Sequence, residues 1–149
     1  MSLKSIKTFF LSFFRELFVY HHTSLEFRAK LFASMIVSNK VDDEYEYKVL
    51  KKIAKEIYKD DEHRIDVLVH TTKEYVNKVI RDNSLDIDSL ILDLNKDLKH
   101  NRRFAKKINM EHLRSFYACG GDEEVALLQT RILEYYENEI KALEKTSKK

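Results

Sequence analysis

The chain contains no proline, and its only two glycines are adjacent, at positions 120 and 121. Average usage would place about seven prolines and about ten glycines in a chain of this length. Hairpin turns need glycine, whereas helix interiors reject glycine at about 1 kcal/mol and proline at about 3 kcal/mol. A chain so poor in both residues is expected to consist almost wholly of helices.

The length of 149 residues predicts one domain with a substantial core. We expect an N-terminal amphipathic aromatic helix within 1–23, packed on the body or on a partner. A helical domain should follow over 24–143, and a disordered basic tail over 144–149. No stretch is long enough to act as a linker between two domains.

Apolar residues recur at helical spacing in seven segments. The fourth helix is expected to start near Asp61, and Asp86 or Asp88 is the expected N-cap of the fifth. Adjacent glycines should stop the sixth helix. The expected segments are 3–20, 24–37, 42–58, 61–81 and 86–98, a sixth helix carrying Phe104, Ile108, Leu113 and Phe116, and a seventh from Asp122 through Ile140.

Two stretches share one order of features, namely an apolar helical run, a short polar turn, an acidic start and a second amphipathic run. They are Leu31–Tyr58 and Leu113–Ile140. This repetition predicts an all-α, single-domain bundle of about seven helices, built from two pseudo-repeated helix–acidic turn–helix units.

These paired units resemble the TerB-like domain, which occurs in tellurite-resistance proteins and in DjlA-type membrane co-chaperones. The resemblance covers roughly residues 24–143. In the first unit, Val41 matches the apolar position of the family turn and Glu46 matches the glutamate that starts the next helix. In the second unit, Ala118, Gly120 and Glu124 match the small residue, the glycine and the glutamate.

Both turns also depart from the family pattern. Ser38 and Cys119 stand where the family has aspartate, and Asn39 replaces the first glycine. Two oxygen ligands that a family member could offer to a cation are therefore missing.

The resemblance implies an acidic, metal-associated module. Acidic residues in a first helical turn also stabilise the helix by about 0.3–1 kcal/mol through capping and the helix dipole, which explains them without a metal. If the two turns meet at one end of the bundle, a divalent cation is the second interpretation. Its candidate ligands are Asp42, Asp43, Glu46, Asp122 and Glu124.

Two other groups of residues have side chains capable of chemistry. His63, Asp66 and His70 share one face of a helix and could coordinate a transition metal, but no fourth ligand is implied and a solvated face is favoured. Cys119 could act as a nucleophile or redox sensor, but no histidine with an orienting acid lies beside it in the sequence, which favours inert packing. No catalytic residue is predicted.

The N-terminal helix carries an aromatic stripe, and three interpretations of it stay open: packing on the body, docking on a partner or a second copy, and contact with a membrane surface. The segment is too short and too charged to span a bilayer. Its candidate partner-binding residues are Phe9, Phe10, Phe13, Phe14, Leu17 and Phe18.

Charge and cysteine content limit the partners and the compartment. The chain has 27 Lys and Arg residues and 25 Asp and Glu residues, so its net electric field is weak and nucleic acid is not an expected partner. One cysteine cannot form an internal disulfide, which fits the cytoplasm, with a peripheral position at the inner membrane as an alternative.

The sequence therefore predicts a non-enzymatic binding or scaffold protein with a protein partner. The resemblance implies a role in tellurite, oxidative or envelope stress, with a divalent cation as the one cofactor to consider. Two alternatives remain, the regulatory part of a DjlA-like co-chaperone system and a small metal- or cysteine-dependent enzyme.

Overall fold

The computed structural model describes residues 23–38, 44–116 and 123–147, and every element in these ranges is a helix. The expected helix at 3–20 lies outside them. The prediction of an all-α fold is confirmed for the described residues. The elements are α2 (Thr23–Val37), α3 (Glu44–Tyr58), α4 (Glu62–Ile80), α5 (Ile87–His100), the 3-10 helix η1 (Arg102–Lys107), α6 (Met110–Ser115) and α7 (Glu123–Ser147).

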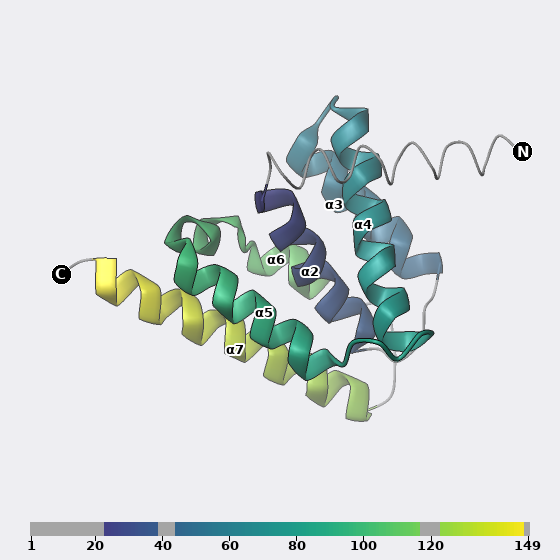
Figure 1. Ribbon diagram of the computed structural model, residues 1–149. Helices are drawn as coiled ribbons and strands as arrows, with labels where there is room; N and C mark the ends of the chain where they lie inside the picture. Colours follow the sequence, from purple (N-terminus) through teal and green to yellow (C-terminus); the bar gives the residue numbers. More distant parts are fainter. Residues whose placement is uncertain (1–22, 39–43, 117–122, 148–149) are drawn as a thin grey trace, which may run out of the picture.

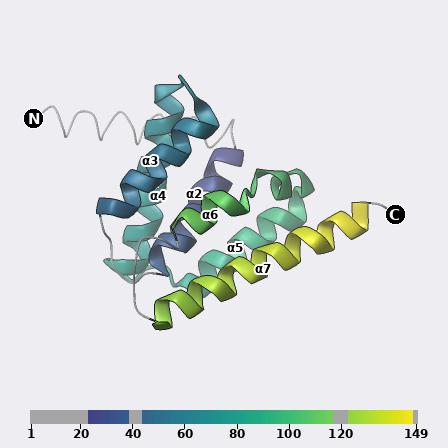
Figure 2. The ribbon, with the colours of Figure 1, turned by 180° about the vertical axis from the view of Figure 1, so that it is seen from behind.

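Helix α2 lies at the centre of the bundle. Every residue from 31 to 38 is buried, because the run LFASMIV is apolar except for Ser34. It packs against α4, α5 and η1. Figure 1 shows α3 and α4 on one side of α2 and α5 with α7 on the other. Figure 2, seen from the opposite side, shows α6 in front of α2.

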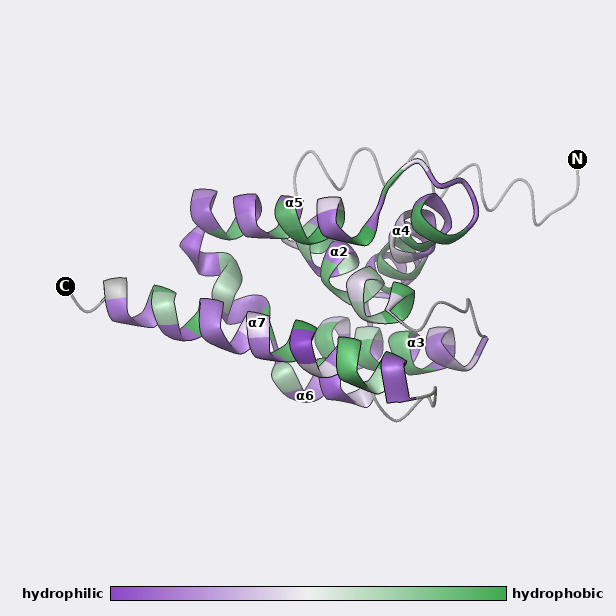
Figure 3. Cartoon of the chain, turned by 90° about the horizontal axis from the view of Figure 1, so that it is seen from below, coloured by the Kyte–Doolittle hydropathy of each residue, from purple (hydrophilic) through white to green (hydrophobic). Residues whose placement is uncertain are grey.

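One hydrophobic cluster contains residues from every described helix. Helices α5 and α7 overlap in the first two views, yet Figure 3 shows them on opposite sides of the bundle. The buried leucines of α5, at positions 90, 94 and 98, recur at the helical spacing of four and lie on the face toward the core. The largest fully buried side chains are Tyr136, Phe27, Phe32, Phe116, Leu25, Leu31, Met35, Ile36, Leu50, Leu68, Leu90 and Leu94.

The expected start of α4 near Asp61 is confirmed, and of the two candidate caps of α5 the structure selects Asp86. An Asp61 carboxylate oxygen accepts a hydrogen bond from the Arg64 amide at 3.1 Å, and Asp86 accepts one from the Ser89 amide at 2.7 Å. The hydrogen bond from the Ser89 backbone lowers the pKa of the Asp86 carboxyl below its usual value. Both carboxylates satisfy amides that a helix start leaves without an intrahelical partner.

The prediction of one continuous sixth helix is wrong. The segment divides into η1 and α6, because Ile108 and Asn109 adopt extended backbone angles between them. The Asn109 side chain accepts from the amides of Glu111 and His112 at 2.9 and 3.3 Å, which starts a new helix. Apolar spacing alone does not show this break, since asparagine can interrupt a helix by capping the next one.

The tail predicted for 144–149 is also different in the structure. Helix α7 continues to Ser147, so residues 144–147 are helical and not disordered. Ile140 and Leu143 pack against the core beside η1, which holds this last part of the helix.

The two predicted repeat units differ in their first helices. In the first unit this helix is α2, with 15 residues and a fully buried second half, and in the second it is α6, with six residues. Both inter-helix turns lie outside the described residues. None of the helices in the described ranges is long and apolar enough to cross a membrane.

Candidate functional site

The predicted cation ligands divide between described and undescribed residues. Asp42, Asp43 and Asp122 lie outside the described ranges. Glu46 lies in the first turn of α3 and is 1% exposed, whereas Glu124 lies in the first turn of α7 and is exposed. Within residues 23–38, 44–116 and 123–147, no group of three or more His, Cys, Asp or Glu residues is placed to hold a metal ion. The cation site stays a prediction.

The histidine face of α4 has a simpler explanation. His63 is exposed, and the half-buried His70 forms a 3.0 Å pair with Glu74, one turn further along the same helix. Such an i, i+4 pair stabilises the helix surface. Cys119 and the aromatic stripe of Phe9, Phe10, Phe13, Phe14, Leu17 and Phe18 lie outside the described residues.

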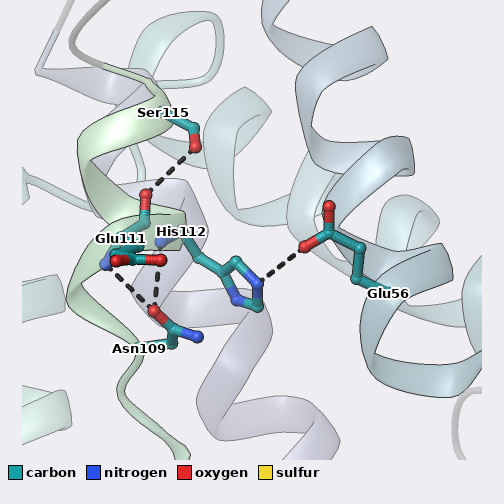
Figure 4. A network of polar contacts seen from close by, with 5 residues as sticks. All are labelled: Glu56, Asn109, Glu111, His112 and Ser115. Carbon is teal, nitrogen blue, oxygen red and sulfur yellow. Dashed lines mark hydrogen bonds and ion pairs between the residues drawn. The ribbon is translucent and has the colours of Figure 1, made fainter.

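A histidine and a carboxylate do meet between α6 and α3. The His112 Nε2 atom lies 3.0 Å from Glu56 Oε2, and Figure 4 shows the ring pointing across to α3. The nearby Ser115 hydroxyl donates to the carbonyl oxygen of Glu111 at 3.0 Å, within its own helix. This geometry joins α6 to α3 by a surface contact and does not place Ser115 as a nucleophile activated by His112.

The structure brings a different set of residues together, where η1 follows α5. Asn101 ends α5, and its side-chain oxygen accepts from the Arg103 amide at 3.1 Å to start η1. Phe104 then enters the core and stacks on Phe27, with ring centroids 4.9 Å apart and planes 15° apart. With Phe104 anchored inside, the neighbouring side chains of η1 are turned outward.

These outward side chains are almost all cationic. The window 99–107 contains five Lys or Arg residues and no acidic residue, and we call it the basic window. Because the whole chain has a net charge of only +2, removing these five cations leaves a net charge of −3 on the rest. Its cations are Lys99, Arg102, Arg103, Lys106 and Lys107, all exposed.

The cations of the basic window have no counter-ion within the described part of the chain. No hydrogen bond or ion pair involves their side chains there. Lys99 lies in the last turn of α5, where a positive charge stabilises the end of the helix dipole. Arg102, Arg103, Lys106 and Lys107 lie beyond that turn, so the α5 dipole accounts for them less well.

Beside three of these cations the surface is hollowed. The hollow has a volume of about 340 Å³, and its floor contains Ala105 from η1 together with Ile140 and Leu143 from α7. Figure 3 shows η1 next to the C-terminal half of α7, which forms the opposite wall. We call this the η1–α7 groove, and it is lined by Arg102, Arg103, Ala105, Lys106, Ile140, Leu143 and Glu144.

The groove combines an apolar floor with guanidinium and ammonium groups on one wall. Such a site suits a ligand that has both apolar surface and negative charge. The sequence analysis did not predict this groove, because the charge of the whole chain is balanced. The signal was the local run KHNRRFAKK, whose charge is one-sided.

The chain was compared with known proteins. No protein-family model, no curated protein and no solved structure matches it.

Proposed function

We propose that this chain is a non-enzymatic binding protein that holds a protein partner in the η1–α7 groove. The observation that carries the proposal is the placement of Arg102, Arg103 and Lys106 beside an apolar hollow, with no counter-ion among the described residues. Buried apolar contact would supply affinity, while the cations would select an acidic partner and speed its encounter.

A protein partner fits the groove better than nucleic acid. The basic window is short, and the rest of the chain has a net charge of −3, which would repel an extended phosphate backbone. The floor of Ala105, Ile140 and Leu143 offers apolar contact that a phosphate backbone does not use. These features favour a localised, partly apolar contact.

We propose further that the chain is a TerB-like protein of a stress response, as its resemblance to that family implies. The order of features shared by the sequence stretches 31–58 and 113–140 supports this assignment, together with the all-helical fold of the described residues. A divalent cation at Asp42, Asp43, Glu46, Asp122 and Glu124 would modulate partner binding. In a related arrangement, the chain would be the regulatory part of a DjlA-like co-chaperone system.

Site-specific photo-crosslinking in the cells that express this protein tests the proposal. Benzoylphenylalanine is placed at Lys107, an exposed residue that follows the groove residue Lys106 in the sequence, and in a control protein at Tyr45, which is 53% exposed on α3. Lys107 belongs to η1 and Tyr45 to α3, and these two helices lie at different ends of the bundle (Figure 2). We expect a discrete protein adduct from position 107 that is absent from position 45.

A charge-matched pair of variants identifies the contact. The groove variant is Arg102→Gln/Arg103→Gln/Lys106→Gln. The control variant, Lys48→Gln/Lys51→Gln/Lys52→Gln, removes three exposed cations from α3 and changes the net charge by the same amount. The adduct should disappear in the groove variant and persist in the control variant. Equal loss in both, or no protein adduct from position 107, contradicts the proposed function.

A further inference from the structure

The distribution of charge and apolar surface in the η1–α7 groove defines its partner more closely. From this distribution we infer that the groove binds a short acidic peptide segment with one bulky apolar residue as its anchor. This inference rests on the proposed function and names the chemistry of the partner.

The size of the groove sets the size of the apolar anchor. A hollow of about 340 Å³ lies at the lower end of the range for small-ligand sites, which is about 300–1,000 Å³. It accommodates one large side chain, whereas an entire helix face would need a longer apolar trough. Ile140, Leu143 and Ala105 provide the contacts for that side chain.

The position of the cations sets where the carboxylates of the peptide lie. Arg102, Arg103 and Lys106 all belong to η1, so the acidic residues flanking the anchor should run along the η1 wall. Glu144 stands on the α7 wall and would repel a carboxylate placed there. The peptide should therefore bind with its acidic side chains toward η1 and away from Glu144.

Other occupants fit less well. The segment 1–22 of this chain has three Lys or Arg residues and one Glu, so its charge does not complement a basic wall. A membrane surface is anionic but flat, and a hollow walled by two helices favours a protruding group. A second copy of the chain is a further candidate, and its binding would appear as self-association.

The test is fluorescence anisotropy with the full-length protein and a labelled peptide in which one phenylalanine is flanked by two glutamates on each side. One comparison peptide replaces the phenylalanine with alanine, and another replaces the glutamates with glutamines. We expect both comparison peptides to bind at least about tenfold more weakly, because a desolvated apolar contact and the charge pairs each contribute.

Variants locate the binding site. The groove variant should weaken peptide binding at least about tenfold, and the control variant on α3 should leave it unchanged. Ala105→Phe fills the hollow and should abolish binding, whereas Ala142→Phe adds the same side chain at an exposed position of α7. Circular dichroism spectra and melting temperatures of all four variants verify that each protein is folded.

Several outcomes overturn the inference. Equal binding of the phenylalanine and alanine peptides would show that no apolar anchor is recognised. Loss of binding in Ala142→Phe to the same extent as in Ala105→Phe would show that the hollow is not the binding site. Binding to phosphatidylserine vesicles, or self-association lost in the groove variant, would identify another occupant if the peptide itself does not bind.

The two proposals fail in different ways. If position 107 gives a protein adduct that the groove variant abolishes, but the acidic peptide does not bind, the proposed function stands and the peptide chemistry is wrong. If the peptide binds in the groove as expected but no protein adduct forms in cells, the proposed function fails while the recognition chemistry stands.

Discussion

The hydroxyl groups of Ser34 on α2 and Tyr136 on α7 lie 2.7 Å apart in the core, where both residues are fully buried. The Ser34 hydroxyl donates its hydrogen to the carbonyl oxygen of Leu31 at 2.6 Å. Tyr136 is therefore the donor in the pair, since a serine hydroxyl has one hydrogen to give. This bond joins two helices that are 102 residues apart in sequence.

Removing the acceptor should cost more than removing the donor. Ser34→Ala leaves the Tyr136 hydroxyl buried without an acceptor and should lower the free energy of unfolding by about 1–3 kcal/mol. Tyr136→Phe leaves the Ser34 hydroxyl bonded to Leu31 and should cost only about 0.5–1.5 kcal/mol. Urea denaturation of both variants measures the two values, and a larger loss in Tyr136→Phe would refute the donor assignment.

Burial of Tyr136 also predicts a dependence of stability on pH. Burial raises the pKa of the Tyr136 hydroxyl above its usual value of 10.0. The unfolded chain therefore loses this proton at a lower pH than the folded chain. The contribution of the neutral hydroxyl is complete below about pH 10 and falls as the pH rises further.

Tyr136→Phe removes this titration, so its free energy of unfolding should fall less than that of the wild type between about pH 9 and pH 11. Tyr135→Phe is the comparison, because burial also raises the pKa of its hydroxyl but the residue is only half-buried. Denaturation curves at several pH values measure the effect. Parallel curves for the wild type and Tyr136→Phe would contradict it.

Much of the fold follows from residue patterns. The absence of proline and the helical spacing of apolar residues predict the helices, and Asp61 and Asp86 mark two helix starts correctly. The break after η1 was not predicted, because Ile108 and Leu113 continue the apolar spacing across Asn109. The capping hydrogen bonds that select a new helix at Asn109 depend on backbone geometry that spacing does not encode.

The groove could be predicted only in part. The one-sided charge of the run 99–107 is visible in the sequence. The apolar floor of the groove is not visible in the sequence, because Ala105 and Leu143 are 38 residues apart and meet only through tertiary packing. Whole-chain net charge averages over such a surface, so it excludes an extended basic footprint and not a local one.

Phe104 should be essential for the position of η1. It is 8% exposed and stacks on Phe27, so Phe104→Ala removes a large buried side chain and should lower the free energy of unfolding by about 3–5 kcal/mol. Phe104→Leu keeps most of the buried volume and should cost less than half as much. Guanidinium denaturation measures both variants, and an equal, small loss would show that Phe104 does not anchor η1.

The contact between His112 and Glu56 should contribute little to stability despite its 3.0 Å length. The Glu56 side chain is 55% exposed, and water screens such a pair. A double-mutant cycle with His112→Ala and Glu56→Gln should give a coupling energy of about 0.2–1 kcal/mol. The cycle is measured by urea denaturation at pH 6, and a coupling above about 3 kcal/mol would indicate a buried, catalytic type of pair.

The end of α3 offers a stabilising substitution. Lys59 has a φ angle of 55°, in the left-handed region, and its amide donates to the carbonyl oxygen of Lys55 at 2.8 Å. A side chain with a Cβ atom makes this conformation unfavourable by about 1–2 kcal/mol, and glycine avoids that cost. Because glycine also gains freedom in the unfolded chain, Lys59→Gly should raise the free energy of unfolding by only about 0.5–1 kcal/mol.

Two controls separate this local effect from a general effect of glycine. Lys52→Gly, at an exposed position inside α3, should destabilise the protein by about 1 kcal/mol, because glycine is a poor helix former. Asn83→Gly should stabilise less than Lys59→Gly, since Asn83 also has a positive φ angle of 50° but asparagine tolerates that region. If Lys59→Gly lowered the melting temperature as Lys52→Gly does, the left-handed conformation would not be what ends α3, and its last turn would depend on the lysine side chain instead.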